Sequence, residues 1–97
     1  MSMQIEVRTA LYITKILGGR SVTVDIPQSS TLHDLLREMV SIYGQAFSDA
    51  VCTEDGYDAH KVAVLLNGTS VAAISSGVDT PLKPDDDVLI MPIISGG

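Results

Sequence analysis

The residues with the clearest chemical potential are at the end of the sequence, where Ser95-Gly96-Gly97 follows an apolar run over residues 88–94. Glycine has no Cβ, so a nucleotide or another backbone can approach it closely. A carboxylate with a pKa of about 3.5 is ionised at neutral pH and is a poor electrophile. The tail therefore predicts a reactive carboxylate at Gly97; the alternative is a frayed end, since most domain termini are disordered.

Other residues with reactive or metal-ligating side chains do not form a recognisable site. Cys52 is the only cysteine, so an internal disulfide, a redox pair and a zinc cluster are excluded, and we interpret it as a small hydrophobe. His33 and His60 are isolated, and two separate histidines do not make a metal site. The Asp85-Asp86-Asp87 triplet lacks the ligand spacing of a calcium loop and indicates a solvated turn. We expect no metal site.

Composition restricts the classes of partner. Six basic against twelve acidic residues give a formal charge of −6, and the basic residues are scattered along the sequence. Nucleic-acid binding needs clustered Lys or Arg, and an anionic membrane surface attracts the same residues, so we expect neither partner. The net charge predicts instead that a basic face on a protein partner attracts the chain. No signal peptide or membrane-length apolar run is visible, which favours a cytoplasmic location.

The predicted elements begin with two strands. Residues 3–13 alternate in polarity and predict one half-buried strand, in which Met3, Ile5, Val7, Leu11 and Ile13 share a face. Residues 22–26 alternate likewise and predict a second strand that Pro27 ends. Gly18-Gly19 predicts the turn of a hairpin between them.

A single amphipathic helix is predicted next. Ser29-Ser30-Thr31 followed by Asp34 resembles a capping signature, and Gly44 sits where a helix C-terminal glycine is expected. Between them an apolar stripe recurs at helical spacing; it comprises Leu32, Leu35, Leu36, Met39, Val40 and Tyr43. We expect this helix to lie across a sheet.

The remaining half of the sequence predicts a long loop and further strands. Residues 45–60 have no clear period and are the segment we expect to be a mobile loop. Residues 61–66 are nearly all apolar, as in a strand buried on both faces, and Asn67-Gly68 predicts a hairpin turn into a short return strand over 69–74. Residues 82–87 predict a turn before a last strand over 88–94.

These elements predict an α+β fold formed by one domain, residues 1–97, with a flexible tail at about 95–97. The order is compatible with a β-grasp fold, a mixed sheet of four to five strands with one main helix packed on one face. That fold requires the first and last strands to pair at the centre, and the pattern alone does not give the pairing.

The sequence resembles the MoaD/ThiS-type sulfur carriers, which are ubiquitin-like β-grasp proteins. The resemblance rests on residues 62–68, on Thr80-Pro81-Leu82-Lys83 with the acidic turn after it, on Pro92, and on Ser95-Gly96-Gly97. The helix with Leu32, Leu35 and Leu36 is similar to the family helix, and the likeness to the first strands is looser. Members usually have glycine in the turn where this chain has Asp85–Asp87, and residues 45–60 make the chain longer than the shortest members.

The resemblance implies a carrier without an active site of its own. A partner enzyme would use ATP to adenylate the Gly97 carboxylate, which would then become a thiocarboxylate; no cofactor is bound. The likeness is greatest to MoaD-like small subunits of molybdopterin synthase, which implies a large catalytic subunit as second partner. We expect partners to bind an apolar patch and the tail behind it, comprising Met91, Pro92, Ile93, Ile94, Ser95 and Gly96.

Three alternatives remain open at this point. The chain could be a ubiquitin-like modifier joined through Gly97 to lysines, a sulfur carrier for thiamin or another metabolite, or a plain interaction domain. Carriers and modifiers both begin with adenylation, so the sequence does not separate them, and it identifies neither the sulfur acceptor nor the partner.

Overall fold

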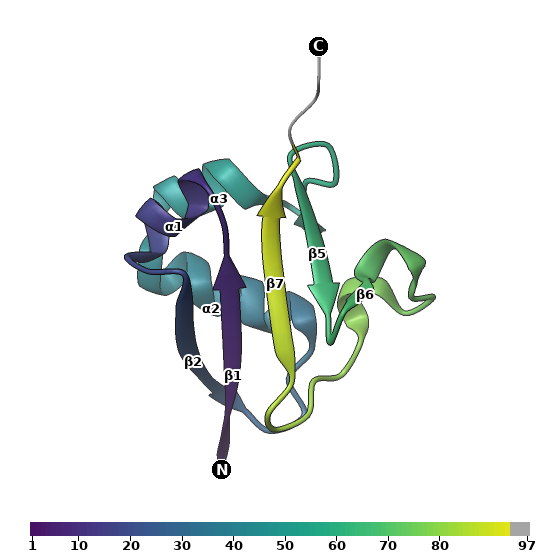
Figure 1. The fold of residues 1–97 in the computed structure, drawn as a ribbon. Helices are drawn as coiled ribbons and strands as arrows, with labels where there is room; N and C mark the ends of the chain where they lie inside the picture. Colours follow the sequence, from purple (N-terminus) through teal and green to yellow (C-terminus); the bar gives the residue numbers. More distant parts are fainter. Residues whose placement is uncertain (94–97) are drawn as a thin grey trace.

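The computed structural model describes residues 1–93, and its centre is a five-stranded mixed sheet in the order β2-β1-β7-β5-β6 (Figure 1). The strands are β1 (Ser2–Thr9), β2 (Ser21–Pro27), β5 (Val62–Leu66), β6 (Thr69–Ser70) and β7 (Asp87–Pro92). The first and last strands, β1 and β7, pair in parallel, and the other neighbouring pairs are antiparallel. The central pairing required for a β-grasp fold is therefore confirmed.

One long helix and two short ones accompany the sheet. Helix α2 (Leu32–Tyr43) crosses one face, whereas α1 (Tyr12–Leu17) and α3 (Gln45–Val51) lie towards the end of the sheet where β7 finishes (Figure 1). A small hairpin of β3 (Cys52–Thr53) and β4 (Gly56–Tyr57) and two 3₁₀ turns, η1 (Val71–Ala73) and η2 (Gly77–Asp79), complete the described chain. Within residues 1–93, no helix has the length and apolar character needed to span a membrane.

The hydrophobic core lies between α2 and one face of the sheet. Alternate residues of β1 point into it, as the period-two pattern predicted, so Met3, Ile5 and Val7 are buried while Gln4 and Glu6 are exposed. From α2 the buried residues are Leu32, Leu35, Leu36 and Met39, which confirms the predicted stripe. No helix formed by residues 1–93 covers the opposite face of the sheet (Figure 1).

The predicted start of the main helix is confirmed in detail. Thr31 Oγ1 accepts a hydrogen bond from the Asp34 N–H at 3.2 Å, and Asp34 Oδ2 accepts one from the Thr31 N–H at 2.9 Å. This capping box satisfies amides that the first helical turn leaves without partners. The hydrogen bond from Thr31 is the main cause that lowers the pKa of Asp34. Gly44 ends the helix with φ 81°, where a side chain would be strained.

The single strand predicted over residues 3–13 is wrong beyond Thr9. Residues 12–17 form α1, because Ile13 and Leu17 are one helical turn apart and both are buried. Leu11 is 57% exposed rather than in the core, with φ 58° and ψ −134°. Gly18 is the left-handed cap of α1, so Gly18-Gly19 is not the hairpin turn that we expected. The antiparallel pairing of β1 with β2 is confirmed.

The mobile loop predicted over residues 45–60 is also wrong. These residues form α3 and the β3–β4 hairpin, and Phe47 and Val51 are fully buried. The Phe47 ring lies 6.2 Å from the Tyr43 ring of α2, so α3 packs directly on the main helix. The segment shows no single period because it contains a short helix followed by a short hairpin.

Three strand predictions need smaller corrections. Strand β5 is buried on one face only, with Ala63 and Leu65 partly exposed on the other. The Asn67-Gly68 turn is confirmed, and both residues have positive φ as a two-residue hairpin turn requires. The return strand is only Thr69–Ser70, and the last strand is Asp87–Pro92 rather than 88–94.

The burial of α3 leads to a stability prediction. Phe47→Ala removes the largest fully buried side chain and should lower the free energy of unfolding by about 3–5 kcal/mol. Urea denaturation measures the loss, and the exposed Ala46→Ser serves as control, with an expected change below about 0.5 kcal/mol. Equal stability of the two variants would mean that α3 does not pack against the core.

Candidate functional site

The central strand β7 holds the base of the predicted reactive tail. It pairs with β1 on one side and β5 on the other, and the Ile93 N–H continues the second ladder by donating to the Lys61 carbonyl at 2.8 Å. Ile93 is the last described residue. The predicted site residues Ile94, Ser95, Gly96 and Gly97 lie outside the described residues.

Pro92 lies at the end of a central strand, a position that proline favours because it has no N–H to donate. It pairs with Val62 of β5, but in an antiparallel pair only alternate residues exchange hydrogen bonds with the partner strand. Because the Ile93 N–H points to β5, the missing N–H of Pro92 lies on the side of β1. The pairing of β7 with β1 ends at Thr9 and Ile90, before Pro92 is reached. The proline therefore removes no hydrogen bond of that ladder.

The predicted binding residues of β7 divide between the two faces of the sheet. Met91 and Ile93 are 40% and 47% exposed, whereas Pro92 between them is buried on the side of α2. The predicted patch is therefore not continuous along the chain. The solvent face offers neighbours from other positions instead, since Ala63 pairs with Met91 and Leu65 with Leu89. We call Ala63, Leu65, Leu89, Met91 and Ile93 the docking face.

Sequence reasoning missed three members of the docking face. Ala63 and Leu65 were assigned to a strand buried on both faces, which left no residues of that strand for a surface. Leu89 precedes the predicted patch in sequence. Ala63 and Leu65 were excluded because we interpreted the apolar run as a strand buried on both faces. A strand with one buried face and one partly exposed apolar face fits the same sequence equally well.

An ion pair borders the docking face. Arg8 donates from Nη2 to Asp87 Oδ2 at 2.6 Å and from Nε to Asp87 Oδ1 at 2.9 Å, and Arg8 lies beside Leu89 in the parallel register. The hydrogen bonds with Asp87 raise the pKa of Arg8. The side chains of Arg8 and Asp87 are 49% and 31% exposed, so the pair orients polar groups at the border more than it stabilises the fold.

The acidic turn before β7 is built from specific hydrogen bonds. Asp86 accepts from the Lys83 N–H at 2.8 Å and from Asn67 Nδ2 at 2.9 Å, and the Asp87 N–H donates to Asn67 Oδ1 at 2.8 Å. Asp85 takes φ 70°, the conformation for which family members usually supply glycine and which Asp tolerates better than most residues. No group of residues among 1–93 has the arrangement needed to hold a metal ion.

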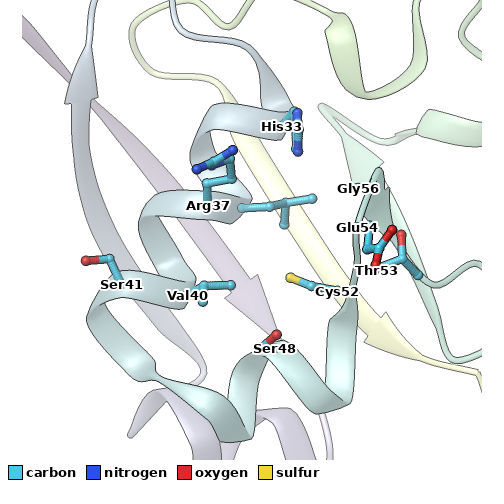
Figure 2. Close-up of a pocket in the computed structure, with 10 residues that line it drawn as sticks. His33, Arg37, Val40, Ser41, Ser48, Cys52, Thr53, Glu54 and Gly56 are labelled. Carbon is cyan, nitrogen blue, oxygen red and sulfur yellow. The ribbon is translucent and has the colours of Figure 1, made fainter.

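A cavity of about 360 Å³ lies on the other side of the molecule, between α2, α3 and the β3–β4 hairpin (Figure 2). It is lined by His33, Leu36, Arg37, Val40, Ser41, Ser48, Cys52, Thr53, Glu54 and Gly56. Figure 2 shows the Cys52 sulfur directed towards α2, with His33 and Arg37 on that helix. The cavity is on the helix side of the sheet, so it is separate from the docking face.

The Cys52 thiol has the surroundings of a packing residue. It is partly buried against the hydrophobic core, and burial raises its pKa. A raised pKa reduces the fraction of thiolate, which is the nucleophilic form. The interpretation of Cys52 as a small hydrophobe agrees with this environment.

Comparison with known proteins gives three consistent similarities. The sequence profile described as the ThiS family matches residues 13–97. Small archaeal modifier protein 3 of Haloferax volcanii is 28% identical over 95 residues, which cover 98% of this chain and all of that protein. The solution structure of the Haloferax volcanii HVO 2177 protein has a TM-score of 0.84 and 26% identity, over 99% of this chain and 88% of its own.

A more distant structure, the BexX/CysO complex of Amycolatopsis orientalis, matches with a TM-score of 0.75 at 20% identity. The match covers 96% of this chain and 99% of the matched chain. At that identity the likeness concerns the fold alone.

The environment of Cys52 predicts slow thiol chemistry. Because its pKa is raised, alkylation by iodoacetamide near neutral pH should be several-fold slower than for a free cysteine in a short peptide, and about as fast once the chain is unfolded in urea. Mass spectrometry over time measures both rates. A native rate equal to that of the peptide would show that Cys52 is an accessible nucleophile.

Proposed function

The chain belongs to the ThiS family of ubiquitin-like proteins, and from this membership we propose that the carboxylate of Gly97 is its reactive group. The observation that carries the proposal is the position of β7 at the sheet centre, where pairing with β1 holds it as far as Ile90 and hydrogen bonding on the β5 side holds the chain as far as Ile93, four residues before Gly97. A strand held in this way presents the segment after it at a constant place on the domain. In this proposal the protein is a carrier without catalytic groups of its own.

The proposed chemistry begins with ATP bound by an activating enzyme. An oxygen of the Gly97 carboxylate attacks the α-phosphorus, pyrophosphate leaves, and the product is an acyl-adenylate. Sulfur supplied as hydrosulfide (HS−) then forms a bond to the carbonyl carbon, AMP leaves with the electron pair of the broken acyl–oxygen bond, and loss of the S–H proton yields the thiocarboxylate. We propose that this sulfur is donated in molybdopterin biosynthesis, the pathway of the MoaD-like proteins whose motifs the sequence resembles. The protein itself would bind no cofactor and would act in the cytoplasm.

Two partner enzymes follow from this proposal, the adenylating enzyme and a large catalytic subunit of the molybdopterin synthase type. The docking face supports them, because it places partly exposed apolar side chains on the uncovered face of the sheet. The matched BexX/CysO structure is described as a complex, which supports the idea that such a fold assembles with a larger partner. Both partners need the tail, so we propose that they bind the docking face in turn.

A second candidate function is protein modification, in which a lysine amine rather than sulfur attacks the adenylated or thioester-linked Gly97. The relative named small archaeal modifier protein 3 favours it, since the two sequences align over nearly their whole lengths. Activation is common to both functions, and the acceptor differs.

Intact-protein mass spectrometry on chain purified from its native host separates the two products. Replacement of one terminal oxygen by sulfur, localised to Gly97 by fragmentation, supports the sulfur carrier. Thiol-resistant conjugates from Gly97 to lysine support the modifier. If the host protein carries sulfur, the same measurement in strains that lack molybdopterin or thiamin synthesis identifies the pathway.

Deletion of Gly97 should abolish activation, because the shortened chain ends one residue too early in the ATP site. The free energy of unfolding should change by less than about 0.5 kcal/mol. ATP–pyrophosphate exchange with the activating enzyme measures the first effect, and urea denaturation measures the second. Ser75→Ala, a substitution at an exposed residue outside the predicted site, is the control and should remain active. Normal thiocarboxylate formation by the deletion variant would refute the assignment of Gly97.

Met91→Asp should weaken binding of the activating enzyme without unfolding the domain. The change places a charge at the centre of the docking face, so the KM for the carrier should rise at least about tenfold with little change in kcat. Ile42→Asp is the matched control, because Ile42 is also exposed but lies on α2. Similar KM values for the two variants would remove the docking face from the proposal.

A further inference from the structure

Several exposed side chains surround the end of the sheet at which β7 finishes. We call Leu11, Tyr12, Lys15, Arg20 and Lys61 the tail-end rim. Strand β1 runs parallel to β7, so α1 and the residues after it follow at this same end (Figure 1). The Arg20 carbonyl accepts from the Thr9 N–H at 2.8 Å, and the Lys61 carbonyl accepts from the Ile93 N–H at 2.8 Å.

The rim and the end of β7 together hold most of the exposed large apolar side chains among residues 1–93. Leu11 and Tyr12 are 57% and 48% exposed, and with Met91 and Ile93 they are four of the six large hydrophobic residues exposed within residues 1–93. Clustered exposed apolar side chains mark interaction surfaces. Leu11 is also held at φ 58° and ψ −134°, a conformation that costs energy for any residue except glycine. The fold therefore keeps a strained, exposed leucine where glycine would be easier to accommodate.

The charge at this end differs from the charge of the remaining surface. Lys15, Arg20 and Lys61 are accompanied there by Asp49 and Asp58, because Lys61 Nζ donates to the Asp49 carbonyl and the Lys61 N–H to that of Asp58. Counting side chains alone, three cations and two carboxylates give this end a charge of +1. Since the side chains of the whole chain sum to −6, the remaining side chains carry −7. The strand that leads to the tail therefore finishes at an end whose side chains are not net acidic.

We infer that the tail-end rim is a second contact surface, and that it binds an acidic, partly apolar surface around the mouth of the channel in which the activating enzyme receives Gly97. This inference rests on the proposed function and reverses the expectation from net charge, which was a basic partner face. The partner's acidic surface attracts the rim and repels the remaining, strongly acidic surface, so the carrier approaches with its tail first. Lys61 of the rim accepts a hydrogen bond from the Ile93 N–H, so the rim meets the docking face at that residue.

The charge part of the inference is tested by two double variants that lose the same charge. Lys15→Gln with Arg20→Gln alters the rim, and Arg37→Gln with Lys83→Gln alters α2 and the turn before β7. With the purified adenylating enzyme of the same organism and ATP, the rim variant should raise the KM about tenfold at low ionic strength, while the control stays within about twofold. The difference should shrink as salt is added.

The apolar part is tested by Leu11→Gly. Glycine accepts the backbone conformation of Leu11, so the thermal midpoint should be unchanged or higher while the KM rises several-fold. A purely structural role for Leu11 would give the opposite result, a lower midpoint with an unchanged KM. Ile42→Ala controls for the loss of an exposed hydrophobic residue elsewhere.

The outcomes separate this inference from the proposed function. If the unaltered chain is adenylated and the rim variant has an unchanged KM, the rim is not a contact surface for the activating enzyme. The proposed function is then unaffected. Absence of adenylation of the unaltered chain overturns both. Self-association in sedimentation that the rim substitutions abolish assigns the rim to a second copy of the chain, which also overturns the inference.

Discussion

The parallel pairing of β1 with β7 is the constraint on which the rest of the structure depends. It joins the first and last strands of the domain at the sheet centre, with Val7 opposite Val88 and Thr9 opposite Ile90. All four of these residues are buried, so a register slip would expose the core. The same pairing makes β1 and β7 finish at one end, which brings α1 close to the base of the tail.

The parts of this arrangement that could be predicted from the sequence are those in which a few neighbouring residues determine the local backbone structure. The Thr31–Asp34 capping box and the Asn67-Gly68 turn each satisfy a specific backbone requirement, and both were predicted correctly. Leu11 and Ile13 were assigned to the wrong element because apolar residues two positions apart fit the alternation of a strand. The same spacing also occurs where a helix begins, as it does here at Tyr12. Segment 45–60 was misassigned because its helix is only seven residues long, and burial of Phe47 and Val51 against α2 and the core stabilises it more than its own propensity does.

The candidate site shows the same division between local and tertiary information. The exposure of Met91 and Ile93 and the strand-end position of Pro92 agree with patterns visible along one strand. Leu65 and Ala63 join the docking face only through their register with β7, which no pattern along the chain specifies. The distribution of charge also depends on the fold. The net charge of −6 describes the chain as a whole, whereas the fold brings Lys15, Arg20 and Lys61 together at one end.

The lack of an N–H at Pro92 also affects how the protein separates from a partner. A strand that ends with free donors on one side offers a template on which another chain can extend the sheet. At Pro92 the side facing β1 offers no donor, so a neighbouring chain cannot continue the β1 ladder along it. Association at this place then depends on side chains rather than on a shared sheet. In the proposed exchange between two enzymes, a contact made by side chains can end quickly, and a single proline at the end of a central strand would contribute to that turnover.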